Sequence, residues 1–321
     1  MAPFNPPSIS DRNMRKLAPL TALTTLIALP ALAEPPSVIA DIPATGALVQ
    51  QVLGDLGDVG VLLPAGGNAH HHQLRPSGAA ALQDAGLLVW VGPELTPWLE
   101  RSAEALNGGT SLPLLALPDT HRRSVTEAHG EDHHDEEDGH DHDHDHGDID
   151  PHAWLDPDNG KLWLTAIAQA LSEADPENAA TYAANAEAGI TQLDQTVQQV
   201  SAQLDPVAGQ PFLVFHDAYG YFTDSFGLQP AIAVSLGDAS APSAARLAEL
   251  RDRIDEAGIR CAFPETGHDP ALIDSLIAGT GIQLGEALDP SGVGQEMGAG
   301  LYPALLTQMG GTLAQCLGTP E

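Results

Sequence analysis

The sequence predicts an α/β protein of two lobes, each a mostly parallel sheet with flanking helices, joined by one long helix. Short apolar runs alternate with helix-like segments in the first part of the chain, and the same alternation returns after residue 205. The longest helical pattern lies between these two parts. Alternating strands and helices indicate parallel sheets with helices on both faces. A chain of 321 residues is long enough for two domains.

The two lobes are expected to span residues 34–174 and 206–321, and each contains several short apolar runs of the length of buried strands. In the first lobe we predict strands over Ser37–Ala40, Val59–Leu63 and Leu87–Val91, and helices over Gly46–Leu53, Gly78–Asp84 and Thr96–Leu106. In the second lobe we predict strands over Phe212–Phe215, Ala231–Val234, Ile259–Phe263 and Ile282–Leu284, and helices over Tyr219–Phe226, Ser243–Ala257, Pro270–Ala278 and Leu301–Cys316.

The linking helix is predicted over residues 175–205. Asp175 is a favourable N-cap residue with Pro176 at the first helical position, and Asp205-Pro206 ends the pattern. Apolar residues recur at spacings of three and four along one face, at Ala186, Ile190, Leu193, Val197, Val200 and Leu204. A helix of roughly 40 Å between two lobes acts as a stiff strut. We therefore expect no large hinge closure.

The chain is strongly acidic, with 44 Asp and Glu residues against 12 Lys and Arg and a formal net charge of −32. Phosphate backbones and anionic lipid surfaces repel such a protein, which argues against nucleic acid and membrane-surface partners. Cations are the partners that this charge attracts.

Residues 1–33 have the pattern of a cleavable secretory signal. Arg15 and Lys16 precede the apolar run Leu17–Leu29, and Ala31-Leu32-Ala33 supplies small residues for cleavage after Ala33. The run is shorter than the roughly 20 apolar residues that span a bilayer. We expect an exported, soluble mature protein. The alternative is a buried N-terminal helix.

Cys261 and Cys316 are the only cysteines. An even count in an exported protein suggests one disulfide, which would tie the last helix to a strand of the second lobe. The alternative is a pair of buried free thiols.

Residues 127–150 hold seven histidines and twelve carboxylates without any Lys or Arg. Such a segment cannot bury apolar area, so we expect a disordered loop. Imidazoles bind zinc and similar metals, and a flexible tract of them offers several weak sites. The auxiliary metal ligands predicted here are His129, His133, His134, His140, His142, His144 and His146. The alternative is a solvated acidic insert that binds nothing.

Other candidate ligands stand near the ends of predicted strands. His70 and Asp289 follow such strands, His216 ends one, and His152 comes directly after the acidic segment. In open α/β sheets, ligands bind at the carboxyl ends of the strands. Two facing lobes could therefore bring three imidazoles and a carboxylate together, a set that suits four-coordinate zinc. On composition alone, each histidine is better explained as a satisfied, partly buried polar residue than as a ligand.

Five phrases occur in order along the chain together with the His-rich insert: Leu74-Arg75-Pro76-Ser77, Val89-Trp90-Val91-Gly92-Pro93-Glu94, Pro151-His152-Ala153-Trp154, Phe215-His216-Asp217-Ala218-Tyr219 and Leu288-Asp289-Pro290. Together they resemble the ZnuA family, the periplasmic zinc-binding receptors of high-affinity zinc ABC importers, over nearly the whole mature chain. The resemblance implies two pseudo-symmetric lobes joined by a rigid helix, with Zn²⁺ captured in the cleft and delivered to a membrane permease. The cysteine pair also falls where enteric members look to have their disulfide.

By motif, the resemblance implies that His70, His152 and His216 are metal ligands, with Asp289 or water as the fourth. His71 and His72 stand where relatives usually have an acid and an aromatic residue, so either could replace His70.

The resemblance also suggests roles for residues outside this set. Some relatives have a Glu directly before the first ligand, and Ala69 stands there in this chain. Glu265 looks like a residue that contacts a ligand rather than the metal, and His268 like a surface residue.

Three other functions fit parts of the pattern. A manganese receptor of the same fold looks to have a carboxylate as its third ligand, whereas His216 is the softer choice. A secreted zinc hydrolase would need a general base beside the ligands, and no His-Glu-x-x-His helix is present. A plain zinc buffer would have the His-rich tract as its purpose. We expect a monomeric receptor without enzymatic activity, small organic substrate or nucleic acid partner.

Overall fold

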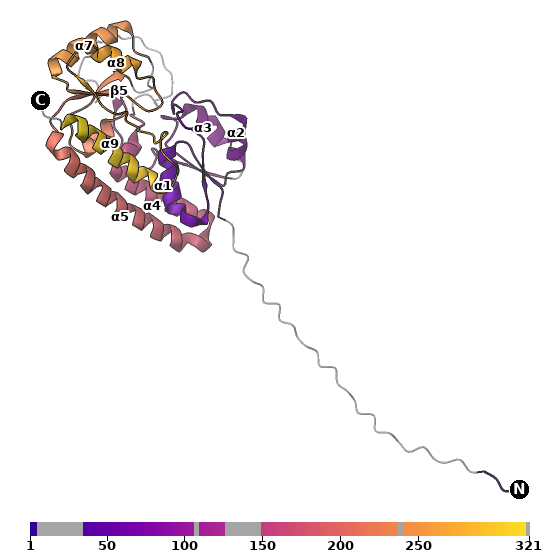
Figure 1. Cartoon of the computed structure of the whole chain (residues 1–321). Coiled ribbons are helices and arrows are strands. Elements are labelled where there is room, and N and C mark those ends of the chain that lie inside the picture. The colour runs from indigo at the N-terminus through magenta and orange to yellow at the C-terminus, as the bar shows by residue number, and fades with distance from the viewer. Residues whose placement is uncertain (5–34, 106–108, 126–148, 237–240, 319–321) are drawn as a thin grey trace. The chain divides into compact units, whose positions relative to one another are not determined.

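The computed structural model describes residues 1–4, 35–105, 109–125, 149–236 and 241–318. From Ala33 onward the chain forms one compact unit, which contains two four-stranded parallel sheets (Figure 1). The strand orders are β2-β1-β3-β4 and β6-β5-β7-β8. In each sheet, the strand that comes first along the chain lies between the second and the third. The predicted fold of two α/β lobes with one repeated topology is confirmed.

The first sheet consists of β1 (Val38–Ala40), β2 (Val59–Val61), β3 (Leu87–Trp90) and β4 (Thr110–Pro113), all parallel. The three predicted strands are present, and the edge strand β4 was not predicted. Its helices are α1 (Pro43–Leu53), α2 (Pro76–Gln83) and α3 (Pro97–Glu104). Each of the three has a proline at its start, where the missing N–H is tolerated.

The second sheet consists of β5 (Phe212–His216), β6 (Ile232–Ser235), β7 (Cys261–Phe263) and β8 (Gln283–Leu284). Its helices are α6 (Gly220–Ser225), α7 (Ala244–Ala257), α8 (Ala271–Ile277) and α9 (Leu301–Leu317). All eight elements match predicted ones. The predicted disulfide between Cys261 and Cys316 is present and ties β7 to α9.

The long helix α5 (Ala179–Leu204) runs along α4 (Pro157–Ala174), α1 and α9 (Figure 1). The α-helix begins later than predicted, because a 3-10 turn occupies Pro176–Asn178. The carboxylate of Asp175 does not cap the helix but accepts hydrogen bonds from Asn178 and Tyr182. The predicted apolar face is confirmed, since four of its six residues are buried and the other two pack against the core.

Helix α4 was not predicted, although the sequence carries a start signal for it. Asp156 accepts a hydrogen bond from the backbone of Asp158 as N-cap, and Pro157 takes the first helical position. The side chain of Asp156 therefore sets where the helix begins, and Asp156 stands four residues after His152.

One hydrophobic cluster contains buried residues of both lobes and of α4, α5 and α9. Two hydrogen bonds add to it: Trp154 donates from Nε1 to the carbonyl of Pro290 at 2.6 Å, and Tyr302 donates to the carbonyl of Trp154 at 2.6 Å. A shared core supports the expectation of a stiff pair of lobes, because separating them would expose it. Where one lobe ends and the next begins stays a prediction. Among the described residues, no helix is long and apolar enough to span a bilayer.

Gly160 in α4 and Gly311 in α9 form a matched pair for testing this packing. A Cβ atom at Gly160 would lie 2.5 Å from the Tyr302 hydroxyl, whereas one at Gly311 would meet nothing within 4 Å. Tyr302 is fully buried and held by Trp154, so it cannot easily move aside. We expect Gly160→Ala to lower the free energy of unfolding by about 1–3 kcal/mol, and Gly311→Ala to raise it by about 0.5–1 kcal/mol. Urea denaturation of the zinc-free variants measures both changes. Equal stabilisation by the two substitutions would contradict the packing described.

Candidate metal centre

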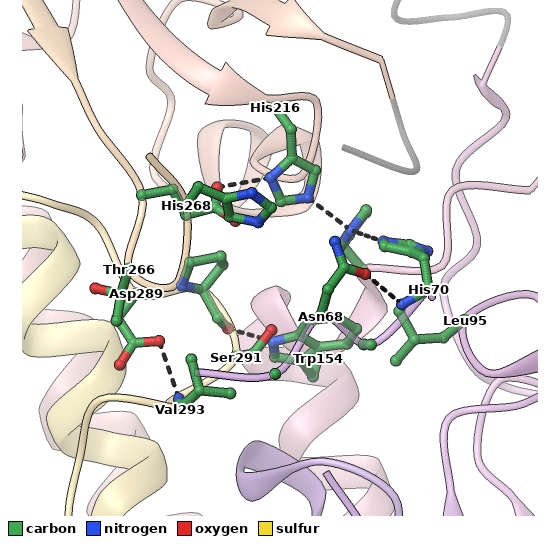
Figure 2. Close-up of a pocket in the computed structure, with 15 residues that line it drawn as sticks. Asn68, His70, Leu95, Trp154, His216, Thr266, His268, Asp289, Ser291 and Val293 are labelled. Atoms are coloured by element: carbon green, nitrogen blue, oxygen red, sulfur yellow. Dashed lines mark hydrogen bonds and ion pairs between the residues drawn. The ribbon is translucent and has the colours of Figure 1, made fainter. Parts of the chain in front are cut away.

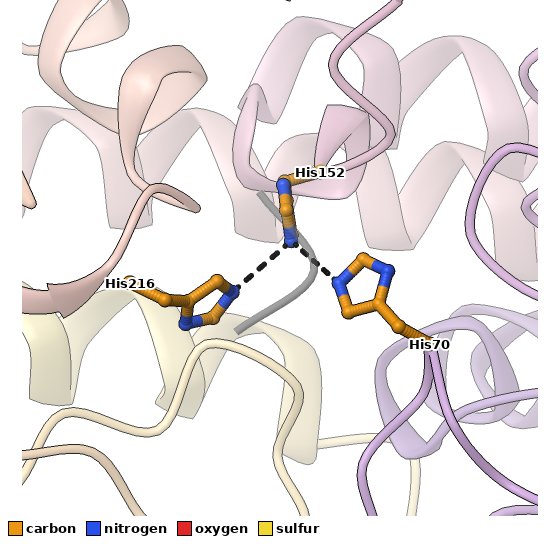
Figure 3. Close-up of side chains that lie close together, drawn as sticks. All are labelled: His70, His152 and His216. Atoms are coloured by element: carbon orange, nitrogen blue, oxygen red, sulfur yellow. Dashed lines mark hydrogen bonds between the residues drawn. The ribbon is translucent and has the colours of Figure 1, made fainter. Parts of the chain in front are cut away.

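Three imidazoles from separate parts of the chain meet between the lobes (Figure 3). Nε2 of His152 lies 3.3 Å from Nε2 of His70 and 3.3 Å from Nε2 of His216. The candidate ligand atoms of the three residues all lie within 4.8 Å of one another. The first lobe supplies His70, the second supplies His216, and His152 lies before α4.

The spacing of these nitrogens fits a tetrahedral zinc ion. Zinc–imidazole bonds of about 2.05 Å at tetrahedral angles place two ligand nitrogens about 3.3 Å apart. Two of the three nitrogen pairs show this separation. Three neutral nitrogen donors with a position left over are a set that zinc accepts.

His70 is placed by the loop that follows β2. The side-chain oxygen of Asn68 accepts the backbone N–H groups of His70 and His71, and Trp98 donates from Nε1 to the carbonyl of Ala69 at 2.7 Å. His71 is exposed, and the ring of His72 packs edge-on against Trp98 at 5.0 Å. Of the three consecutive histidines, His70 is the one that the loop brings to the other two imidazoles.

His152 is oriented by Asp150, two residues earlier. Oδ1 of Asp150 lies 2.8 Å from Nδ1 of His152 and also accepts its backbone N–H at 3.0 Å. A carboxylate only accepts, so Nδ1 carries the proton and Nε2 presents its lone pair to the centre. The expectation that the acidic segment is disordered as far as residue 150 is wrong at its end: Ile149 pairs with Ser124, and Asp150 is buried.

Arg123 holds the other oxygen of Asp150. Its guanidinium lies 3.3 Å from Oδ2 of Asp150 and 2.7 Å from Oδ2 of Asp224 in α6. The pKa of Asp150 stays below its ordinary value: burial raises it, but the hydrogen bonds and charge of His152, aided by Arg123, outweigh burial. The partner of His152 is therefore ionised at neutral pH.

His216 ends β5 and is oriented by Glu265. Nδ1 of His216 lies 2.6 Å from Oε2 of Glu265, and the hydroxyl of Tyr219 donates to the same oxygen at 2.9 Å. This confirms the contact that was expected between Glu265 and a ligand. As with His152, the carboxylate fixes the tautomer that leaves Nε2 free for a metal.

The two outer imidazoles differ in their affinity for protons. Burial, and then the nearby His152 and His216, lower the pKa of His70 to about 2. Burial alone would lower the pKa of His216, but the charge and hydrogen bond of Glu265 raise it above its ordinary value. Protons therefore compete with a metal at His216 well before they compete at His70.

Asp289 lies in the same pocket but outside the group of three (Figure 2). Its two carboxylate oxygens accept the backbone N–H groups of Val293 and Gly294 at 3.0 and 2.9 Å. Burial raises its pKa, against those hydrogen bonds, and the charge of Glu265 adds to the increase.

His268 is not the surface residue that was expected. It lines the pocket, its side chain is 19% exposed, and its ring lies 4.3 Å from that of Phe215. The residues around His268 in the sequence are polar and do not indicate this position. The turn that follows β7 brings the ring of His268 to that of Phe215.

The structure adds functional residues that the sequence did not reveal. Asp150 and Tyr219 both lie next to predicted ligands, and a carboxylate two residues before a candidate ligand is the one signal that could have identified Asp150. The seven auxiliary histidines of the predicted loop lie outside the described residues.

Comparisons with known proteins show the family to which the chain belongs. The family model for ZnuA, the periplasmic component A of the zinc-uptake complex, matches residues 38–316. The high-affinity zinc uptake system protein ZnuA of Paracoccus denitrificans is 54% identical over 319 residues, covering 93% of this chain and 97% of the relative.

Solved structures agree as well. A crystal structure of ZnuA has a TM-score of 0.72 at 26% identity and covers 88% of this chain and 98% of that one. A ZnuA deletion mutant with zinc bound has a TM-score of 0.70 at 25% identity, covering 89% and 99%. The family match spans most of the sequence, and the Paracoccus relative is identical at more than half of the aligned positions. This chain therefore belongs to the ZnuA family of periplasmic zinc-uptake components.

Proposed function

We propose that this protein captures Zn²⁺ between its two lobes in the periplasm and passes it to the membrane permease of a zinc ABC importer. Zinc is the cargo, and His70, His152 and His216 are its ligands. The observation that carries the proposal is the spacing of the three Nε2 atoms, with 3.3 Å in two pairs. Carboxylates at Nδ1 of His152 and His216 support it, because a ligating histidine almost always donates its other ring N–H to an acceptor such as a carboxylate.

The donor set favours zinc over manganese. Imidazole nitrogen suits zinc and its neighbours, whereas manganese favours hard oxygen ligands. Asp150 contacts His152 and Glu265 contacts His216 through Nδ1, the ring nitrogen that faces away from the centre. We propose water as the fourth ligand, because Asp289 lies outside the group formed by the three imidazoles.

We propose binding without catalysis. A zinc hydrolase needs a general base that can take a proton from the metal-bound water. Oε2 of Glu265 is engaged by His216 and Tyr219, and Asp150 is engaged by His152 and Arg123. Both carboxylates orient ligands.

Residues 1–33 serve as the export signal in this proposal, and the mature receptor acts as a monomer. Its lobes are residues 34–174 and 206–321, linked by 175–205. The His-rich tract collects zinc weakly near the centre. Ser124 and Ile149, two described residues near the ends of the tract, pair as an antiparallel bridge next to Asp150.

Calorimetry of a variant lacking residues 127–148 tests this function. The bridge between Ser124 and Ile149 allows a short Gly-Ser linker to close the gap. We expect one tight zinc per molecule in the variant and loss of the weaker equivalents of the parent. The reason is that the tight ligands lie on ordered segments outside the tract, and the zinc-bound deletion mutant of a relative is consistent with this.

The same variant isolates the ligands. Adding His152→Ala should weaken the remaining site by at least about 100-fold, whereas His72→Ala, which changes an imidazole packed on Trp98, should leave it unchanged. Circular dichroism checks that each protein is folded. Loss of the tight site on deletion, or its survival in His152→Ala, would refute the proposed function.

Zinc affinity should fall as the pH drops through the neutral range. The ligand must be neutral to coordinate, and the raised pKa of His216 brings its proton into competition first. Glu265→Gln keeps an acceptor for Nδ1 but removes the charge that raises this pKa. We expect its affinity to be about 10–100-fold lower at high pH, and its decline to begin at a lower pH than in the parent. Competitive titration against a zinc chelator between pH 5.5 and 8.5 measures both. An unchanged onset of the decline would show that Glu265 does not control His216.

A further inference from the structure

A fourth imidazole, His268, lies in the pocket without belonging to the group of three. Figure 2 shows its ring next to that of His216, and the ring centroids are 6.2 Å apart. The turn that carries it is fixed by two backbone bonds, from Thr266 to Leu288 at 2.8 Å and from His268 to Glu265 at 3.1 Å. These hydrogen bonds fix the turn, and the turn places the His268 ring in the pocket.

Glu265 lies between the two imidazoles. Its Oε2 atom contacts Nδ1 of His216, and its Oε1 atom lies 3.6 Å from Nε2 of His268. The second distance is too long for a good hydrogen bond. It is slightly longer than the separation of about 3.3–3.5 Å between nitrogen and oxygen ligands of one tetrahedral zinc ion.

His268 is more accessible than two of the three candidate ligands, His216 and His152. Its side chain is 19% exposed, compared with 5% for His216 and 2% for His152. A hydrated zinc ion has to exchange its waters for buried nitrogens, and a buried site needs a path by which the ion arrives. The partly exposed imidazole of His268, together with Oε1 of the buried Glu265, can replace the first waters.

We propose that Nε2 of His268 and Oε1 of Glu265 form a transit site, which holds Zn²⁺ briefly on its way to and from the three histidines. This inference rests on the proposed function of the centre. Glu265 contacts both imidazoles, so an ion at the transit site lies within a few ångströms of its final ligands. Waters complete its coordination there, and each is exchanged as a buried imidazole takes its place.

A transit site has a kinetic signature that a structural role lacks. Because it lowers one barrier that the ion crosses in both directions, it speeds binding and release by the same factor. The equilibrium affinity of the final site does not change. A residue that only positions Glu265, and through it His216, would instead alter the affinity.

The test is stopped-flow measurement of zinc association and of zinc release to a fluorescent chelator. His268→Phe keeps a ring to pack on Phe215 and removes both nitrogens, and His268→Gln checks the result with a polar side chain. His72→Phe is the control, because it makes the same change in an imidazole packed on Trp98 outside this pocket. Melting temperatures confirm that the variants are folded.

We expect both His268 variants to slow association and release by a common factor of about tenfold, comparable to the loss of other groups around metal sites. Their dissociation constants should stay within about twofold of the parent, and His72→Phe should change neither rate. Unchanged rates, or a weaker affinity through faster release alone, would overturn the transit site. Failure of the proposed function is a separate result. It would appear as tight zinc binding that survives His152→Ala, and that measurement does not involve His268.

Discussion

The hydrogen bond between a carboxylate and the outer nitrogen of a histidine is the interaction on which the centre depends. Asp150 holds His152 and Glu265 holds His216, each at less than 3 Å. These contacts turn the inner nitrogens toward one point, because a proton fixed at Nδ1 leaves the lone pair on Nε2. They work only if the segments that carry them keep their positions. The core shared by both lobes, together with the bonds of Trp154 to Pro290 and of Tyr302 to Trp154, provides that constraint.

The charges around the centre follow from the same contacts. A divalent cation bound by three neutral imidazoles brings two positive charges into a largely buried pocket, which is unfavourable without nearby negative charge. Asp150 and Glu265 supply it directly behind the ligands, and Asp289 lies in the same pocket. The net negative charge of the whole chain attracts the ion from solution. Once the ion is bound, these carboxylates stabilise its two positive charges.

Much of the fold could be predicted because buried strands and amphipathic helices leave a local pattern. The elements that were not predicted lack such a pattern. Strand β4 has one aliphatic residue in Thr110–Pro113, and the first residues of α4 are mostly polar, so that only its capping signal indicates the start of the helix. The site depended on tertiary contacts. His70 could not be separated from its two neighbours, because Asn68 and Trp98 decide which ring faces inward. Asp150 shares the composition of the acidic tract, and the position of His268 depends on Phe215, which is distant in sequence.

In the proposed centre, zinc is bound by three imidazoles: His70 from the first lobe, His216 from the second, and His152 from the segment that precedes α4. X-ray absorption at the zinc edge tests it most directly, on the variant without residues 127–148 loaded with one equivalent of metal. We expect a four-coordinate ion with nitrogen and oxygen ligands at about 2.0–2.1 Å, and outer-shell scattering from three imidazole rings. A six-coordinate oxygen shell, or scattering from fewer than three imidazoles, would contradict it.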